Sequence, residues 1–164
     1  MYRHQPGHPR TARTDLRAVL FDLDGVIAPT SQLHRHAWRE VMTPIFAAHG
    51  SPGYSDADYY ELIDGRPRFD GVQAALASRG IRLDWGDPDD EPGGPTVCSI
   101  GNRKNELFEE LLGSGDLAAF PGTVELLRWL TSADVLMAVV SSSRNAGSVL
   151  DALGISDFFE VVVD

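Results

Sequence analysis

The chain has 164 residues, a formal net charge of −10 and a hydrophobic share of 43%, which suits one ordinary globular domain or a core with a small inserted lobe. Its negative charge repels polyanions and argues against nucleic-acid binding as the main activity. No stretch is long and apolar enough to span a bilayer, so we expect no membrane partner. Residues 1–15 lack the apolar centre of a secretion signal, and we expect them to form the disordered tail of a cytoplasmic protein.

The first expected element is a strand in residues 16–21, "LRAVLF", an apolar run typical of a strand buried on both faces of a parallel sheet. Residues 33–115 follow with helical patterns and no convincing strand, which predicts a helical lobe. Pro44 is expected to kink or divide its first helix. Within the lobe, the acidic, Pro- and Gly-rich segment 83–96 is predicted to be a surface excursion without regular structure.

After the lobe, strand and helix patterns alternate with short links. We predict a helix at 122–130, a strand at 134–140, a helix ended by Gly154 and a strand at 159–163. This order is typical of a doubly wound α/β fold. The predicted architecture is therefore a Rossmann-like parallel sheet core, formed by residues 16–32 and 116–164, with residues 33–115 inserted as a helical cap.

Asp22 and Asp24, in "FDLDGVI", directly follow the first strand. Ligands gather at the carboxyl ends of strands in open α/β sheets, and two crowded carboxylates need a cation or a shared proton. Mg²⁺ suits them because it prefers oxygen ligands and leaves positions for water and phosphate. A calcium loop is excluded, because its twelfth position should be Glu and is Leu33. A pair of solvated loop acids remains an alternative.

A second candidate site follows the strand at 134–140, in "VVSSSRN". Hydroxyls and backbone N–H groups at the start of a helix can hold an anion. Ordinary capping of the helix is the alternative interpretation. The phosphate interpretation gains weight because the two aspartates end a neighbouring strand.

Together, "FDLDGVI" and the later "VVSSSRN" resemble the haloacid dehalogenase superfamily, in its β-phosphoglucomutase-like branch with an inserted helical cap. The lobe segments "TSQLHRHAW", "DGRPRFDG" and "GNRKNELF" are similar to cap and linker segments of sugar-phosphate members. The resemblance covers residues 16–164. It implies Mg²⁺-dependent phosphoryl transfer on a phosphorylated sugar, by a phosphatase or a mutase, through an aspartyl phosphate.

The resemblance also implies a role for individual residues. Asp22 would be the nucleophile and Asp24 the general acid/base, and both would contact Mg²⁺. The residues implied to bind phosphate lie in "VVSSSRN", in the serine turn that follows the strand: they are Ser141, Ser142, Arg144 and Asn145. In the cap and its linker, the implied substrate-facing residues are His34, Arg68, Lys104 and Asn105. Solvated surface charges are the alternative for Arg68 and Lys104, and only one of His34 and His36 is expected to face the site.

The resemblance also implies two motifs that no residue of this chain can be assigned to: a lysine that neutralises the aspartyl phosphate, and acids that complete the magnesium site. Both correspond to positions beyond Asp164. We therefore expect a truncated product with an incomplete sheet, whose exposed edge favours self-association. A non-catalytic fragment of such an enzyme is the alternative to an active phosphotransferase.

Overall fold

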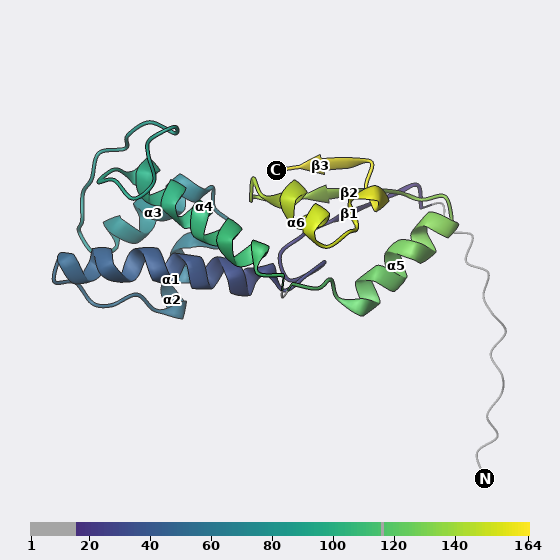
Figure 1. Ribbon diagram of the computed structural model, residues 1–164, viewed down its shortest axis with the longest axis horizontal. Helices are drawn as coiled ribbons and strands as arrows, with labels where there is room; N and C mark the ends of the chain where they lie inside the picture. Colours follow the sequence, from purple (N-terminus) through teal and green to yellow (C-terminus); the bar gives the residue numbers. More distant parts are fainter. Residues whose placement is uncertain (1–15, 116) are drawn as a thin grey trace, which may run out of the picture.

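The structure, a computed structural model, describes residues 16–115 and 117–164, so the tail predicted at 1–15 lies outside the described residues. Figure 1 shows an elongated molecule with a helical lobe at one end and a small sheet with its helices at the other. The strands are β1 (Ala18–Phe21), β2 (Leu136–Val140) and β3 (Val161–Val163). The α-helices are α1 (Thr30–Ala48), α2 (Asp56–Asp58), α3 (Arg68–Ala77), α4 (Val97–Gly113), α5 (Pro121–Ser132) and α6 (Ala146–Ala152). A π-helical turn, η1 (Tyr59–Ile63), and a 3-10 turn, η2 (Ser156–Phe158), complete the set.

The three strands form one parallel sheet in the order β1-β2-β3, which confirms the predicted α/β fold. Ala18 lies opposite Leu136, and Ala138 lies opposite Val161. Side chains alternate between the faces of a strand, so Val19, Phe21, Met137 and Val139 share one face. This face is covered by apolar side chains from α5 and α6, among them Leu127, Leu130, Val149 and Leu150.

The other face of the sheet differs from the expectation. Leu20 is 71% exposed, so β1 is not buried on both faces among the described residues. The apolar run "LRAVLF" is typical of a strand that is buried on both faces of a sheet. The described helices of the core, however, pack on only one face.

The lobe has a separate apolar cluster. Its buried side chains come from α1, α3, η1 and α4 and from Ile81, and they include Trp38, Met42, Phe46, Tyr59, Val72, Leu76 and Ile100. Pro44 was expected to kink or divide the first helix. It does not divide the helix, because α1 continues through Pro44 to Ala48. Pro44 removes only the hydrogen bond to the Glu40 carbonyl, and Glu40 is exposed, so water can satisfy that carbonyl near the end of the helix.

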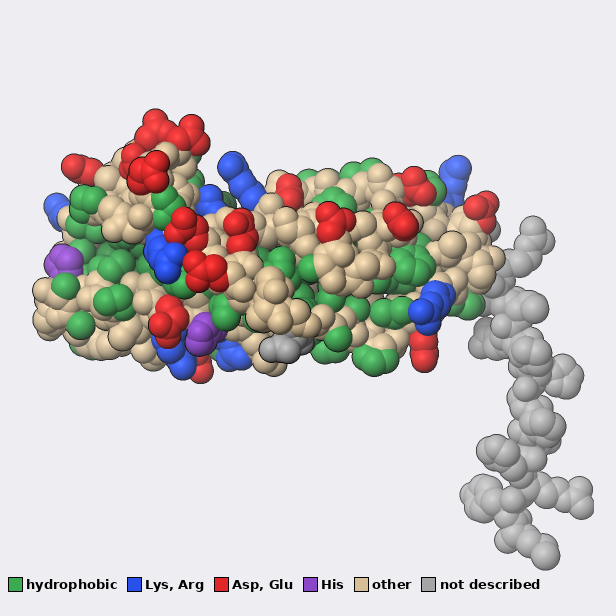
Figure 2. All heavy atoms as spheres, in the orientation of Figure 1, with side chains coloured by type: hydrophobic (Ala, Val, Ile, Leu, Met, Phe, Trp, Pro, Cys, Tyr) green, Lys and Arg blue, Asp and Glu red, His purple; other side chains and the backbone are tan. Residues whose placement is uncertain are grey.

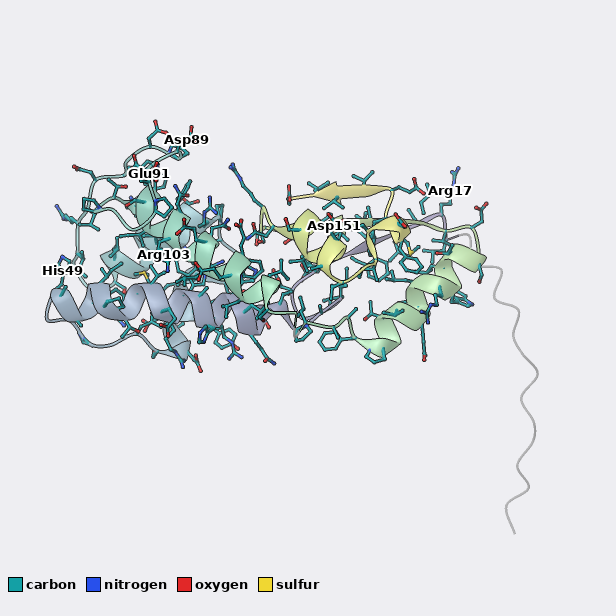
Figure 3. The ribbon with its side chains drawn as sticks, in the orientation of Figure 1. Arg17, His49, Asp89, Glu91, Arg103 and Asp151 are labelled. Atoms are coloured by element: carbon teal, nitrogen blue, oxygen red, sulfur yellow. The ribbon has the colours of Figure 1, made fainter. Side chains whose placement is uncertain are left out.

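Segment 83–96 contains no helix or strand, as predicted, yet it is tied to the lobe. The N–H groups of Val97 and Cys98 donate to the carbonyls of Asp84 and Trp85. Thr96 caps α4 in a capping box with Ser99. The acidic side chains of this segment gather at the upper edge of the lobe in this view, on the loop that carries Asp89 and Glu91 (Figures 2 and 3).

The lobe and the core meet along α1 and α4. Ala37 on α1 and Phe108 and Leu112 on α4 are buried in the core cluster, while other residues of the same helices belong to the lobe cluster. Two long helices therefore join the sheet to the lobe, and the site described next lies at this junction. In residues 16–115 and 117–164, no helix is both long enough and apolar enough to cross a bilayer.

Candidate active site

A cavity of about 140 Å³ lies between the lobe and the carboxyl ends of the strands. Asp24 and residues of the turn before α6 line it from the core side, and residues of α1, η1, α3 and α4, among them His34, line it from the lobe side. The sequence-predicted residues that line it are Asp24, His34, Arg68, Lys104, Asn105, Ser142, Arg144 and Asn145. The fold thus brings together most of the predicted site.

A tight turn after β1 positions Asp24. The N–H groups of Val26 and Ile27 donate to the Leu23 carbonyl, and Gly25 donates to the Ala28 carbonyl. Gly25 has a φ of +78°, a left-handed conformation that residues with a Cβ rarely adopt. The Asp-Gly pair therefore turns the chain so that the carboxylate of Asp24 lies in the cavity.

Asp24 lies in a short chain of polar side chains. Its Oδ1 accepts a hydrogen bond from the Thr30 hydroxyl at 2.5 Å and lies 3.5 Å from Nε2 of His34. On the other side of the ring, Nζ of Lys104 lies 2.7 Å from Nδ1 of His34. With Lys104 donating to Nδ1, the His34 proton sits on Nε2 and faces Asp24. The chain Lys104–His34–Asp24 thus connects the lobe to the core.

Burial and neighbouring charges set the proton affinities of this chain. Burial opposes ionisation of Asp24, but the contacts with His34 and Thr30 outweigh it and hold the pKa of Asp24 below its ordinary value. Burial lowers the pKa of His34, although Asp24 acts in the opposite direction. Burial, reinforced by the charge of Arg68, lowers the pKa of Lys104 to about 7. Asp24 is thus held as a carboxylate, while Lys104 changes charge near neutral pH.

Aromatic side chains hold these polar groups in place. The His34 ring stacks on Phe108, with centroids 4.2 Å apart. Nζ of Lys104 lies 5.0 Å from the Phe108 ring centroid and 5.4 Å from that of Trp38. These rings exclude water from the two basic groups, and they offer the ammonium a favourable π-face when it is charged.

Positive charge converges on the cavity from both sides. Arg68 comes from α3 in the lobe and Arg144 from the turn before α6. Both residues line the cavity, and burial together with the charge of Arg144 lowers the pKa of Arg68. Nε of Arg68 is buried and has no hydrogen-bond partner among the described residues. An anion in the cavity would relieve the repulsion between the two guanidinium groups.

One hydrogen bond joins the two walls of the cavity directly. Nδ2 of Asn145, before α6, donates to Oδ1 of Asn105 on α4 at 2.7 Å. Both residues were candidates from the sequence, and both line the cavity.

Asp22 and Ser141 are not among the residues that line this cavity. Asp22 is exposed, and its Oδ1 accepts a hydrogen bond from the N–H of Leu23 at 2.8 Å. The Ser141 N–H donates to the Val163 carbonyl, and its hydroxyl accepts from the N–H of Ser143. Both residues lie at the carboxyl ends of adjacent strands, one residue after β1 and β2, beside the cavity rather than in its wall.

The sequence did not single out Thr30, which contacts Asp24, or several residues that line the cavity, including Trp38, Tyr59, Asp64 and Arg66. One signal was available for two of them: Thr30, His34 and Trp38 are spaced four residues apart and so share one face of α1. His36 is exposed, which leaves His34 as the histidine that faces the site.

The residues present fit Mg²⁺ by their chemistry, since Asp22 and Asp24 supply the hard oxygen donors it prefers. No group of three or more His, Cys, Asp or Glu side chains is placed to hold a metal ion in the part of the chain that the structure describes. Two aspartates would leave most of an octahedral shell to water, phosphate and other ligands.

Comparison with known proteins gives consistent results. A family model described as "haloacid dehalogenase-like hydrolase" matches residues 16–164. A β-phosphoglucomutase of Mycobacterium bovis is 38% identical over 156 residues, which cover 91% of this chain and 60% of that protein. A β-phosphoglucomutase structure from Clostridium difficile has a TM-score of 0.72 at 27% identity and covers 91% of this chain and 61% of its own.

A structure of CbbY from Rhodobacter sphaeroides, in complex with xylulose-(1,5)bisphosphate, has a TM-score of 0.66 at 26% identity and covers 90% of this chain and 62% of its own. The chain thus spans about 60% of the length of the relatives it matches. Since the family model matches residues 16–164, nearly the whole chain, the chain belongs to the haloacid dehalogenase-like hydrolase family.

Proposed function

We propose that this chain carries out phosphoryl transfer on a phosphorylated sugar, with Asp22 as nucleophile and Asp24 as general acid/base. The observation that carries the proposal is the cavity in which Arg68, Lys104 and Arg144 converge beside the carboxylate of Asp24. A phosphorylated sugar supplies both the anionic charge and the hydroxyl groups that such a cavity suits. The relatives support this class, because two of them are named β-phosphoglucomutases and a third, CbbY, is bound to xylulose-(1,5)bisphosphate.

In the proposed first step, a carboxylate oxygen of Asp22 attacks phosphorus, and the bond between phosphorus and the sugar oxygen breaks. Asp24 gives its proton to the departing oxygen, leaving an aspartyl phosphate. In the second step, water attacks phosphorus and Asp24 takes its proton, which frees Asp22 and releases phosphate. A mutase differs only in that a sugar hydroxyl replaces the water.

The polar chain explains how Asp24 could serve in both directions. Its lowered pKa favours the carboxylate, the form that accepts a proton. Acting as an acid requires a proton, and His34 at 3.5 Å is placed to return one while Lys104 resupplies Nδ1. Thr30 holds the other contact of Asp24 Oδ1 and so positions the carboxylate.

The remaining residues bind phosphate and metal in this proposal. Ser141 and Ser142, with the backbone before α6, would hold the transferring phosphoryl group, while Arg68 would bind a second phosphate from the lobe side. Asp22 and Asp24 would hold Mg²⁺, which when bound neutralises charge on the phosphoryl oxygens. We further propose a cytoplasmic location, a small-molecule partner rather than nucleic acid, and self-association through the free edge of β1.

The second candidate is a non-catalytic phosphate-binding protein of the same lineage. It is favoured by one observation: in residues 16–115 and 117–164, no basic side chain makes a hydrogen bond or ion pair with Asp22. An aspartyl phosphate would need such a neutralising group. The two candidates differ in turnover and share phosphate binding.

Hydrolysis of p-nitrophenyl phosphate and of β-glucose 1-phosphate in the presence of Mg²⁺ tests the proposal. We expect Asp22→Asn and Asp24→Asn to reduce turnover at least about 100-fold. Asp89→Asn, on the loop remote from the cavity, is the matched control and should keep full turnover. Turnover that is unchanged in Asp22→Asn would contradict the role of that residue, and absent turnover with intact phosphate binding would favour the second candidate.

A further inference from the structure

A second cavity, of about 520 Å³, lies in the helical lobe, outside the candidate active site. Residues of α1, α4 and the segment 83–96 line it, and we call it the lobe groove. No residue in the described part of the chain lines both cavities. Figure 3 shows two lining residues of the groove, His49 beside the end of α1 and Arg103 on α4. A cavity of this size can hold a small organic molecule.

The walls of the lobe groove are mostly apolar. Val41 and Ile100 belong to the buried apolar cluster of the lobe, and Ile45, Leu83 and Leu107 pack against that cluster. Figure 2 shows hydrophobic side chains at the surface of this part of the lobe. The groove therefore suits a ligand with an apolar body, because the contact removes apolar surface of both partners from water.

Two hydrogen-bond acceptors of the groove are left over by the helix. Pro44 lies within α1 and has no N–H to donate to the carbonyl of Glu40, and both residues line the groove and are exposed. Nδ1 of His49 lies 2.9 Å from the Ile45 carbonyl, so the neutral ring carries its proton on Nδ1 and keeps Nε2 as an acceptor. A ligand with N–H donors can replace water at these groups.

The charges around the groove favour a cation. The Glu40 side chain forms no ion pair with a residue that the structure describes. Arg103 already pairs with Glu106 at 2.8 Å and with Glu110 at 3.3 Å, so this trio is net negative. The last turn of α1 carries the negative end of the helix dipole and contains no basic residue.

We propose that the lobe groove binds a primary amine with an apolar body, its ammonium group at Glu40 and its apolar part along α1 and α4. A primary ammonium offers three N–H donors and a positive charge, which match the carbonyl and the carboxylate of Glu40. An anionic ligand would be repelled by the same carboxylate. This binding is separate from phosphoryl transfer at the other cavity and does not depend on it.

Calorimetric titration with decylamine, kept below the concentration at which it forms micelles, tests the inference. We expect saturable binding of one molecule per chain. Decyltrimethylammonium keeps the charge and the apolar body but has no N–H donor, so it should bind about 5-fold more weakly. Decanoate reverses the charge and should bind at least about 10-fold more weakly than decylamine. Equal binding of the three probes would overturn the inference.

One pair of variants on α1 locates the binding site. Ala48→Phe fills part of the groove from an exposed position and should reduce the affinity for decylamine at least about 10-fold. Ala47→Phe, at the exposed neighbouring position that does not line the groove, should leave the affinity unchanged. Circular dichroism confirms that each variant folds. Equal affinity of the two variants would place decylamine elsewhere and overturn the inference.

A second pair of variants tests the free carbonyl. Pro44→Ala restores the N–H that bonds to the Glu40 carbonyl within the helix, so it should weaken decylamine binding about 5-fold. Thr43→Ala, at an exposed position outside the groove, should bind decylamine as wild type does. Binding that is as tight in Pro44→Ala as in wild type would overturn the placement of the ammonium group at Glu40.

Discussion

The helical lobe and the sheet core bury their apolar side chains in different ways. In the lobe, α1, α3, η1 and α4 surround one cluster, in which Met42, Phe46 and Val72 are fully buried. In the core, buried apolar side chains cover one face of the sheet only, while Leu20 and Leu136 on the other face are exposed. The lobe is thus a closed unit and the core an open one. The candidate site lies where they join, and it depends on both.

The largest effect on stability should come from Phe108, which belongs to the core cluster and stacks against the His34 ring. Phe108→Ala should lower the free energy of unfolding by about 3–5 kcal/mol, because it leaves a cavity in the core. It should also change the titration of His34, since the stacked ring is lost. Denaturant unfolding and an NMR titration of His34 measure the two effects.

Phe46→Ala is the matched change in the lobe, because Phe46 is equally buried but lies in the other cluster. We expect a comparable loss of stability with an unchanged His34 titration. If both variants altered the titration equally, the two clusters would not be separate units.

The next effect concerns the buried Lys104, whose pKa falls to about 7 in the folded chain from an ordinary value of 10.5. Between these pH values the unfolded chain binds more protons, so the burial of Lys104 destabilises the fold most below pH 7 and least above pH 10.5. Lys104→Met removes this cost. The stability of the variant relative to wild type should rise by about 2–4 kcal/mol as the pH falls from 10 to 7.

Urea unfolding of both proteins at several pH values measures this difference. Arg103→Met is the control, because Arg103 precedes Lys104 on the same helix but has a half-exposed side chain that pairs with Glu106. A stability difference between Lys104→Met and wild type that stays constant from pH 7 to pH 10 would show that Lys104 is not buried as described.

The smallest effect tests the direct contact between the two regions. Asn145 and Asn105 form one hydrogen bond across the cavity. A double-mutant cycle of Asn105→Ala and Asn145→Ala should give a coupling energy of about 0.5–1.5 kcal/mol. Zero coupling in urea unfolding would mean that the lobe and core do not share this contact in solution.

Much of this architecture follows from local sequence patterns. The strands at β1, β2 and β3 were predictable because each is an apolar run flanked by helical periodicity, and Gly154, with a φ of +65°, ends the last helix as its position indicated. The unbroken α1 was not predictable from Pro44, because the cost of a proline depends on whether water reaches the freed carbonyl. The open face of the sheet was not predictable either. An apolar run indicates that a strand is stable when both faces are buried, but it does not show which element buries them.

The candidate site was likewise predictable only in part. Asp24 and the serine turn were identified because each follows a strand, and strand ends converge in a parallel sheet. Thr30 and Trp38 were missed as site residues because a threonine and a tryptophan at helical spacing look like ordinary core positions. The contacts in the folded chain show their place at the site, because Thr30 donates to Asp24 and the Trp38 ring faces Lys104.

The central claim is that the junction of lobe and core is a phosphate site, and calorimetric titration with β-glucose 1-phosphate tests it most directly. We expect measurable binding of β-glucose 1-phosphate. Its affinity should fall at least about 10-fold in Arg68→Ala and in Arg144→Ala, because each variant removes a guanidinium from the cavity lining. Arg39→Ala, which breaks only an exposed pair with Asp56, should bind as wild type does. Equal affinity in all four proteins would contradict the account.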